Sequence, residues 1–195
     1  MKKKTVLKIS VTFILSSLVI ILGNIYTREK TSKNITRVEV SAKTDEYANL
    51  QQVEQASDLI VEGIKTDEEE NVVQRDENGE LLATYTLSTF KVEKVNKTSK
   101  NKSYDIITIL ENEAYDENTR SIYHINGYKK MKPGKRYLLM LQKTEKNYYV
   151  PTGVNYGKIA ISNRDNEIYT NDNSMKKEIK EIQNSAVIKY KFGVK

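Results

Sequence analysis

A basic N-terminus is followed at once by a long uncharged segment. Met1–Lys8 carries four lysines, and Ile9–Thr27 contains nineteen residues without a charge, centred on the apolar run Val11–Leu22. A helix of about that length crosses the ~30 Å hydrocarbon core of a bilayer, and lysines ahead of such a segment stay on the cytoplasmic side. We therefore expect residues 1–27 to be a signal or anchor segment that spans the cell membrane over about 9–27. The N-terminus would lie inside and the following domain outside.

The end of this segment is a poor site for signal peptidase. That enzyme requires small residues one and three positions before the cleaved bond, whereas Gly23 and Thr27 each follow an isoleucine by two residues. The sequence therefore predicts an uncleaved anchor, with cleavage and secretion as the alternative.

The native chain is accordingly expected to fractionate with membranes and to need detergent for its release. Cell fractionation combined with N-terminal sequencing measures this. Recovery of most of the chain from the culture medium, with a new N-terminus after residue 23 to 27, would show that it is secreted instead.

Composition limits what the part outside the membrane can do. A chain of 195 residues has room for one domain. The absence of cysteine excludes disulfides, thiolate metal sites and thiol catalysis, and exported proteins without disulfides are usual in Gram-positive bacteria. The net charge is +6, but four lysines precede the apolar run, and +6 less 4 leaves +2. A value so close to neutral does not indicate a nucleic-acid partner.

Residues 28–46 are rich in Thr, Ser, Lys and Asn and predict a tether, in which the alternation of Val38 and Val40 adds a short edge strand. Residues 47–195 are the predicted domain. It begins with a short helix that Thr44 caps and ends with a helix over Ser174–Ser185 and an extended tail over Val187–Phe192.

Between the helices, short apolar runs alternate with turn signals. Thr66–Asn71 predicts an acidic loop, Asp76–Gly79 a hairpin turn, and Lys132–Lys135 a second tight turn. A shift in the apolar alternation near Ser88–Thr89 predicts a bulge. The expected strands are Leu59–Ile64, an arm from Val72, Leu82–Val95, Tyr104–Leu110, Ile122–Ile125, Arg136–Leu141, Tyr148–Val150 and Lys158–Ile161.

Several motifs follow one another in a characteristic order. They are Ala56-x-Asp58-Leu-Ile-Val-x-Gly63, then Phe90-x-Val92-x-x-Val95, then Gly127-Tyr128, then Met131-Lys-Pro-Gly-Lys-x-Tyr137-Leu-Leu. This order resembles the OB-like barrels of tissue inhibitors of metalloproteinases and netrin-type modules, and Gram-positive surface proteins with the same pattern. The resemblance covers roughly residues 47–161 and implies a small closed barrel. The inhibitors chelate zinc through an N-terminal cysteine, which this chain lacks, so no functional residue is carried over.

The candidate catalytic and metal motifs in the sequence are each incomplete. His124 is the only histidine, and Ser121 or Ser103 with an aspartate could complete a triad, but no nucleophile elbow accompanies them. We interpret His124 as an ordinary strand residue. Gly153–Lys158 has three residues between its glycines where a phosphate loop needs four, and Asp76–Leu87 does not match a calcium loop. We expect no catalytic residue, no cofactor and no metal.

Charge segregation is the one pattern that predicts binding. Asp58–Glu80 has nine acidic residues against two basic, and Lys129–Lys146 has seven basic against one acidic. Lysines and tyrosines on an OB-like face grip polyanions or sugar chains through charge and ring stacking. Strands that alternate outward Lys with inward Tyr give the same pattern without a site. The candidate binding residues are Lys129, Lys130, Lys132, Lys135, Arg136, Tyr148, Tyr149 and Tyr156.

The sequence therefore predicts a mainly β fold, a small closed OB-like β-barrel with short flanking helices behind an N-terminal membrane helix. The favoured function is a non-catalytic extracytoplasmic binding module, membrane-anchored or secreted, whose partner is an envelope protein or an anionic cell-wall polymer. The alternative is a small extracytoplasmic hydrolase. His124→Ala distinguishes the two, because only an enzyme that depends on the histidine would lose activity.

Overall fold

The computed structural model describes residues 35–40, 42–99, 102–161 and 168–190. The chain divides into two compact units, Met1–Ile35 and Thr36–Lys195. The strands and helices described below all lie in the second unit. The predicted anchor, the first part of the predicted tether and the last residues of the predicted tail lie outside the described residues. Across the described part of the chain, no helix combines the length and apolar character needed to span a membrane.

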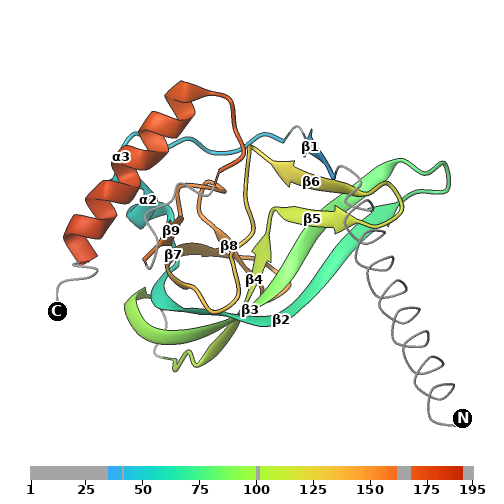
Figure 1. Cartoon of the computed structure of the whole chain (residues 1–195). Coiled ribbons are helices and arrows are strands. Elements are labelled where there is room, and N and C mark those ends of the chain that lie inside the picture. The colour runs from blue at the N-terminus through green and yellow to red at the C-terminus, as the bar shows by residue number, and fades with distance from the viewer. Residues whose placement is uncertain (1–34, 41, 100–101, 162–167, 191–195) are drawn as a thin grey trace, which may run out of the picture. The chain divides into compact units, whose positions relative to one another are not determined.

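The second unit is mainly β, and most of its strands pair in a ring (Figure 1). In order of pairing, the ring consists of β2 (Leu59–Arg75), β3 (Leu81–Thr98), β4 (Ile106–Glu111), β8 (Tyr149–Pro151) and β7 (Arg136–Lys143), and β7 pairs back to β2. All of these pairings are antiparallel except that of β4 with β8. A further strand, β9 (Lys158–Ala160), pairs with β7.

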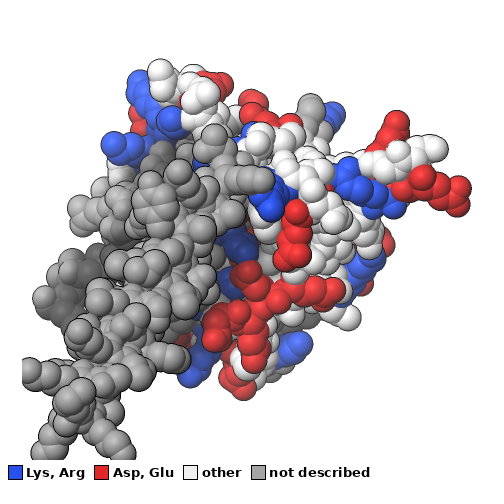
Figure 2. Space-filling view, turned by 45° about the vertical axis from the view of Figure 1, so that its right-hand side comes forward, with Lys and Arg blue, Asp and Glu red and all other residues white. Residues whose placement is uncertain are grey.

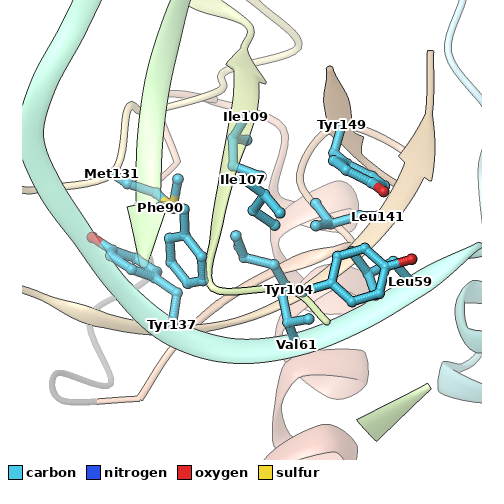
Figure 3. Packing of buried hydrophobic residues seen from close by; sticks show 11 residues of the cluster. Leu59, Val61, Phe90, Tyr104, Ile107, Ile109, Met131, Tyr137, Leu141 and Tyr149 are labelled. Carbon is cyan, nitrogen blue, oxygen red and sulfur yellow. The ribbon is translucent and has the colours of Figure 1, made fainter. Parts of the chain in front are cut away.

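Strand β7 separates two hydrophobic cores, because its side chains alternate between its two faces. Tyr137, Leu139 and Leu141 pack in the inner core, and Leu138 and Met140 pack in the outer core. Figure 3 shows the inner core, which also contains Leu59, Val61, Phe90, Tyr104, Ile107, Ile109, Met131 and Tyr149. The predicted core strand is confirmed, and it is buried on both faces.

Two helices cover the outer core (Figure 1). The short helix α2 (Leu50–Ala56) contributes Val53, and the long helix α3 (Asn173–Tyr190) contributes Ile179, Ile182 and Ala186. The spacing of the buried residues in α3 is that of one face of an amphipathic helix.

A second, three-stranded sheet lies beside the projecting half of the β2–β3 hairpin (Figure 1). It consists of β1 (Thr36–Val40), β6 (Ser121–Ile125) and β5 (Glu113–Asp116), with β1 parallel and β5 antiparallel to β6. The side chain of Asn71 in β2 donates to the carbonyl oxygen of Tyr115 at 2.7 Å and accepts from its amide at 2.8 Å. Asn71 thus joins the edge of this sheet to the hairpin.

The predicted acidic loop over 66–71 is wrong, because β2 continues through it to Arg75. Glu69 and Glu70 pair with Ser88 and Leu87, and the carboxylates from residue 67 to residue 70 are solvent-exposed on the strand. The register shifts between Lys65 and Glu69, opposite Thr89. A bulge therefore lies where the alternation predicted one. Its extra residues belong to β2, however, and not to β3, where the alternation shifts.

The predicted helix cap and tail are also corrected. The cap of α2 is Asn49, whose Oδ1 accepts from the amide of Gln52 at 3.0 Å, rather than Thr44. Helix α3 continues through the predicted extended segment to Tyr190, whose hydroxyl donates to Glu54 of α2 at 2.8 Å. Strand β5 was not predicted. The remaining strands and both predicted turns are confirmed, with Gly79 and Gly134 at positive φ.

Candidate functional site

Two of the predicted binding cations are held in ion pairs. The ammonium group of Lys130 contacts the carboxylate of Glu69, and a guanidinium nitrogen of Arg136 lies 2.8 Å from Glu93. Although burial acts to raise the pKa of Glu69, Lys130 and Lys65 lower it. The acidic segment therefore lies beside the basic one and neutralises part of it. Figure 2 shows acidic and basic side chains intermingled on the face that it presents.

The predicted tyrosines do not share a face. Tyr149 is 8% exposed in the inner core, where its ring packs edge-on against Tyr104, and Tyr156 is 5% exposed in the outer core against Tyr47. Burial, followed by a hydrogen bond with Tyr104, raises the pKa of Tyr149 to about 12. Tyr148 is half-buried in the turn between β7 and β8. The rings of Tyr149 and Tyr156 therefore serve packing on opposite sides of β7.

Of the predicted cations, Lys130 lines a hollow of about 510 Å³ together with Glu69, and Lys129 lies close to a residue that lines a larger hollow. Lys132 and Lys135 flank the turn at Gly134, where the side chain of Lys132 is exposed. The ammonium nitrogen of Lys129 instead lies 5.1 Å from the centre of the Tyr169 ring. Tyr169 lines a hollow of about 760 Å³ between β1, β6 and the start of α3.

Polar side chains from three segments line this hollow. Strand β1 contributes Arg37 and Glu39, which lie two residues apart and therefore on one face. The first turn of α3 contributes Lys176, and the segment before it contributes Asp172. Asp172 caps the helix, since its carboxylate accepts from the amides two and three residues ahead, at 2.8 and 3.1 Å. The lining is suited to a polar ligand rather than to an apolar one.

Two cations approach one aromatic ring at the edge of this hollow. The guanidinium carbon of Arg37 lies 4.5 Å from the centre of the Tyr169 ring, and Lys129 approaches the same ring. Each contact is a cation–π interaction, but the two positive charges also repel each other. An anionic group bound between them would remove that repulsion.

His124 forms the inner wall of the hollow. It is 4% exposed, and its Nδ1 is buried without a hydrogen-bond partner. Its partners in the neighbouring strands are Glu39 of β1 and Glu113 of β5, so a carboxylate stands on either side of the imidazole. Burial lowers the pKa of His124, Glu39 opposes this, and Arg37 lowers the pKa further.

A buried carboxylate in β4 joins the segment that carries Lys129 to the ring of β-strands. Glu111, fully buried in β4, accepts from the hydroxyl of Ser88 at 2.5 Å, the hydroxyl of Tyr128 at 3.0 Å and the amide of Met131 at 2.6 Å. Burial raises the pKa of Glu111, and these hydrogen bonds act against that rise. Lys158 lies 4.1 Å from the centre of the Tyr128 ring and donates to the carbonyl of Lys129.

Backbone contacts place Tyr169 beside this segment. Its amide donates to the carbonyl of Gly127 at 2.6 Å, and Ile168 pairs with Tyr128 in an isolated bridge. Gly127 has a φ of 68°, and a Cβ there would lie 2.8 Å from the backbone of Tyr169. Glycine therefore permits the close approach that brings the Tyr169 ring next to Lys129.

The two serines that were considered as triad partners of His124 are hydrogen-bonded elsewhere. The hydroxyl of Ser121 donates to the carbonyl of Thr119 at 3.3 Å, and that of Ser103 donates to Asp105 at 3.3 Å. Neither serine is hydrogen-bonded to His124. Within the described ranges, no cluster of three or more His, Asp or Glu side chains is arranged to hold a metal ion.

Sequence reasoning identified Lys129 and singled out His124, but it missed Arg37, Tyr169 and Lys176. The alternation of Val38 and Val40 was a signal that Arg37 and Glu39 share a face. Nothing in the sequence indicated that this strand pairs with β6 or that α3 starts beside it.

No protein-family model matches the chain, and no curated protein matches it at a significant level.

Proposed function

We propose that this chain is a non-catalytic binding module on the outer side of a cell membrane, and that it binds an anionic cell-wall polymer. The hollow beside His124 receives one anionic group of the polymer. The observation that carries the proposal is the approach of Arg37 and Lys129 to the ring of Tyr169, with Lys176 lining the same hollow.

The ring of strands supports an OB-like barrel as the scaffold. Its first strand, β2, pairs with both the second and the fourth, and its third strand, β4, runs parallel to the fifth, β8. This order agrees with the five-stranded Greek-key barrel of OB folds, many of which bind oligosaccharides or oligonucleotides. It is also the arrangement implied by the resemblance to tissue inhibitors of metalloproteinases and netrin-type modules. Fold alone does not specify a ligand.

The surface favours a polymer over an envelope protein. Stable protein interfaces usually have an apolar centre. The large exposed apolar residues of the second unit are spread over several elements in the described part of the chain, for example Leu82 in β3, Ile106 in β4 and Ile188 in α3. The hollow of about 760 Å³ is instead lined mostly by charged and polar residues.

The test compares two triple variants of the full chain in neutral detergent. The hollow variant is Arg37→Gln, Lys129→Gln, Lys176→Gln, and the control is Lys132→Gln, Lys135→Gln, Lys146→Gln, which removes the same charge elsewhere. The probe is poly(glycerol phosphate), and its affinity is measured by calorimetry at several salt concentrations. We expect the hollow variant to lose roughly tenfold to a hundredfold in affinity, at about 0.5–1 kcal/mol for each exposed ion contact.

The same variant should also show a shallower dependence on salt, because fewer counterions are released on binding. The control variant should bind nearly as the native chain does. Equal losses in both variants would show that net charge, not the hollow, attracts the polymer. Absence of binding by the native chain at low salt would overturn the proposal and leave an envelope protein as the partner.

A further inference from the structure

We propose that binding at the hollow is coupled to protonation of His124, whose imidazole takes up a proton as the anionic group enters. This inference rests on the proposed function, since it describes how the same site is regulated. Its basis is the position of the histidine, which is buried, forms part of the wall and has a ring nitrogen without a partner.

The positive and negative side chains around His124 are nearly equal in number. Strand β1 contributes Arg37 and Glu39, and β5 contributes Glu113. The other facing groups are Lys129 near Tyr169, and Asp172 and Lys176 at the start of α3. Glu113 is itself engaged, since it accepts from the amide of Lys130 at 3.2 Å.

In the free protein the surroundings of His124 disfavour its protonated form. Burial lowers the pKa of His124 below its ordinary value, and Arg37 adds to that effect. A protonated imidazole would add a positive charge to a wall that already carries Arg37, with Lys129 close by. A negative charge in the hollow would act against both of these effects.

An anionic group in the hollow reverses this preference. It attracts the imidazolium and offsets Arg37 and Lys129, so the pKa of His124 rises on binding. By linkage, the ligand must then bind more tightly where the proton is already present. Affinity should rise as the pH falls through the interval between the pKa of the bound state and the lower pKa of the free state.

A single histidine makes the experiment direct. The full chain in neutral detergent, labelled uniformly with carbon-13 and nitrogen-15, is titrated by NMR from pH 8 to pH 5.5, with and without saturating poly(glycerol phosphate). The phosphodiester groups keep their charge throughout this range. We expect the pKa of His124 to be higher with the polymer, and affinity to increase about threefold to tenfold between pH 8 and pH 5.5.

A matched variant isolates the histidine. His124→Gln fills similar space without titrating, so its affinity for the polymer, whatever its value at pH 8, should not rise as the pH falls. Perturbed signals from Arg37 and Lys176 with an unchanged pKa of His124 would overturn this inference alone. No perturbed signal in the hollow would overturn the proposed function and the inference with it. Inorganic phosphate is titrated in a separate experiment. If phosphate raised the pKa of His124 as much as the polymer does, the ligand of the site would be a free anion and not a polymer.

Discussion

Replacing Glu111 with alanine is expected to destabilise the chain by about 3–5 kcal/mol. The substitution leaves three buried donors without their acceptor, on Ser88, Tyr128 and Met131, and it opens a cavity. It also removes the carboxylate that lies near the buried ammonium group of Lys158. Urea unfolding followed by circular dichroism measures the change as a shift of midpoint at constant slope.

Glu111→Gln is the control for this prediction. Glutamine keeps the shape and one acceptor oxygen, and its amide nitrogen can donate to the hydroxyl of Ser88, so we expect a loss of about 1–2 kcal/mol. If the alanine variant were as stable as the glutamine variant, neither the packing of this side chain nor its hydrogen bonds would contribute to stability. The alanine variant should also bind polymer more weakly, because Glu111 holds the segment that carries Lys129.

Gly63→Ala is expected to cost about 3 kcal/mol or more. Gly63 lies in β2, where the strand pairs with both β3 and β7, and a Cβ there would lie 2.1 Å from the carbonyl oxygen of Lys91 and 2.7 Å from the ring of Phe90. Neither neighbour can move without disturbing a pairing or the inner core. Thermal unfolding of the purified chain gives the magnitude.

Gly79→Ala separates this steric effect from the general cost of replacing glycine. Gly79 has a φ of 83°, and no atom lies within 4 Å of the Cβ position. Strain in the left-handed region alone should cost about 1 kcal/mol. Similar losses at positions 63 and 79 would contradict the role assigned to close packing at Gly63.

Local patterns predicted the strands well where one face is buried. The run Arg136–Leu141 and the hairpin turn at Gly79 stand close to where the structure has them. The acidic residues of β2 misled the prediction, because a strand whose outer face meets solvent accepts carboxylates at no great cost. The end of α3 was missed because its last turn is fixed by Tyr190 and Glu54, a contact between distant segments.

The candidate site was less predictable, since it depends on pairings that no local pattern shows. Lys129 stood out through its basic neighbours, but its contact with Tyr169 arises from a loop that returns to Gly127. Tyr149 and Tyr156 were expected to stack on a ligand, and each is buried on its own side of β7. Sequence alone gives the alternation along a strand but not the neighbours on either side.

The closure of the ring has a consequence for the order of folding. Leu59, at the start of β2, pairs with Leu141, and the link between β4 and β8 rests on the pair Ile109 and Tyr149. A chain that emerges N-terminus first can therefore close the ring of strands only when residue 151 is available. Distant pairings of this kind make folding slow and late. Under the proposed location on the outer side of a membrane, that delay would keep the polypeptide unfolded while it crosses.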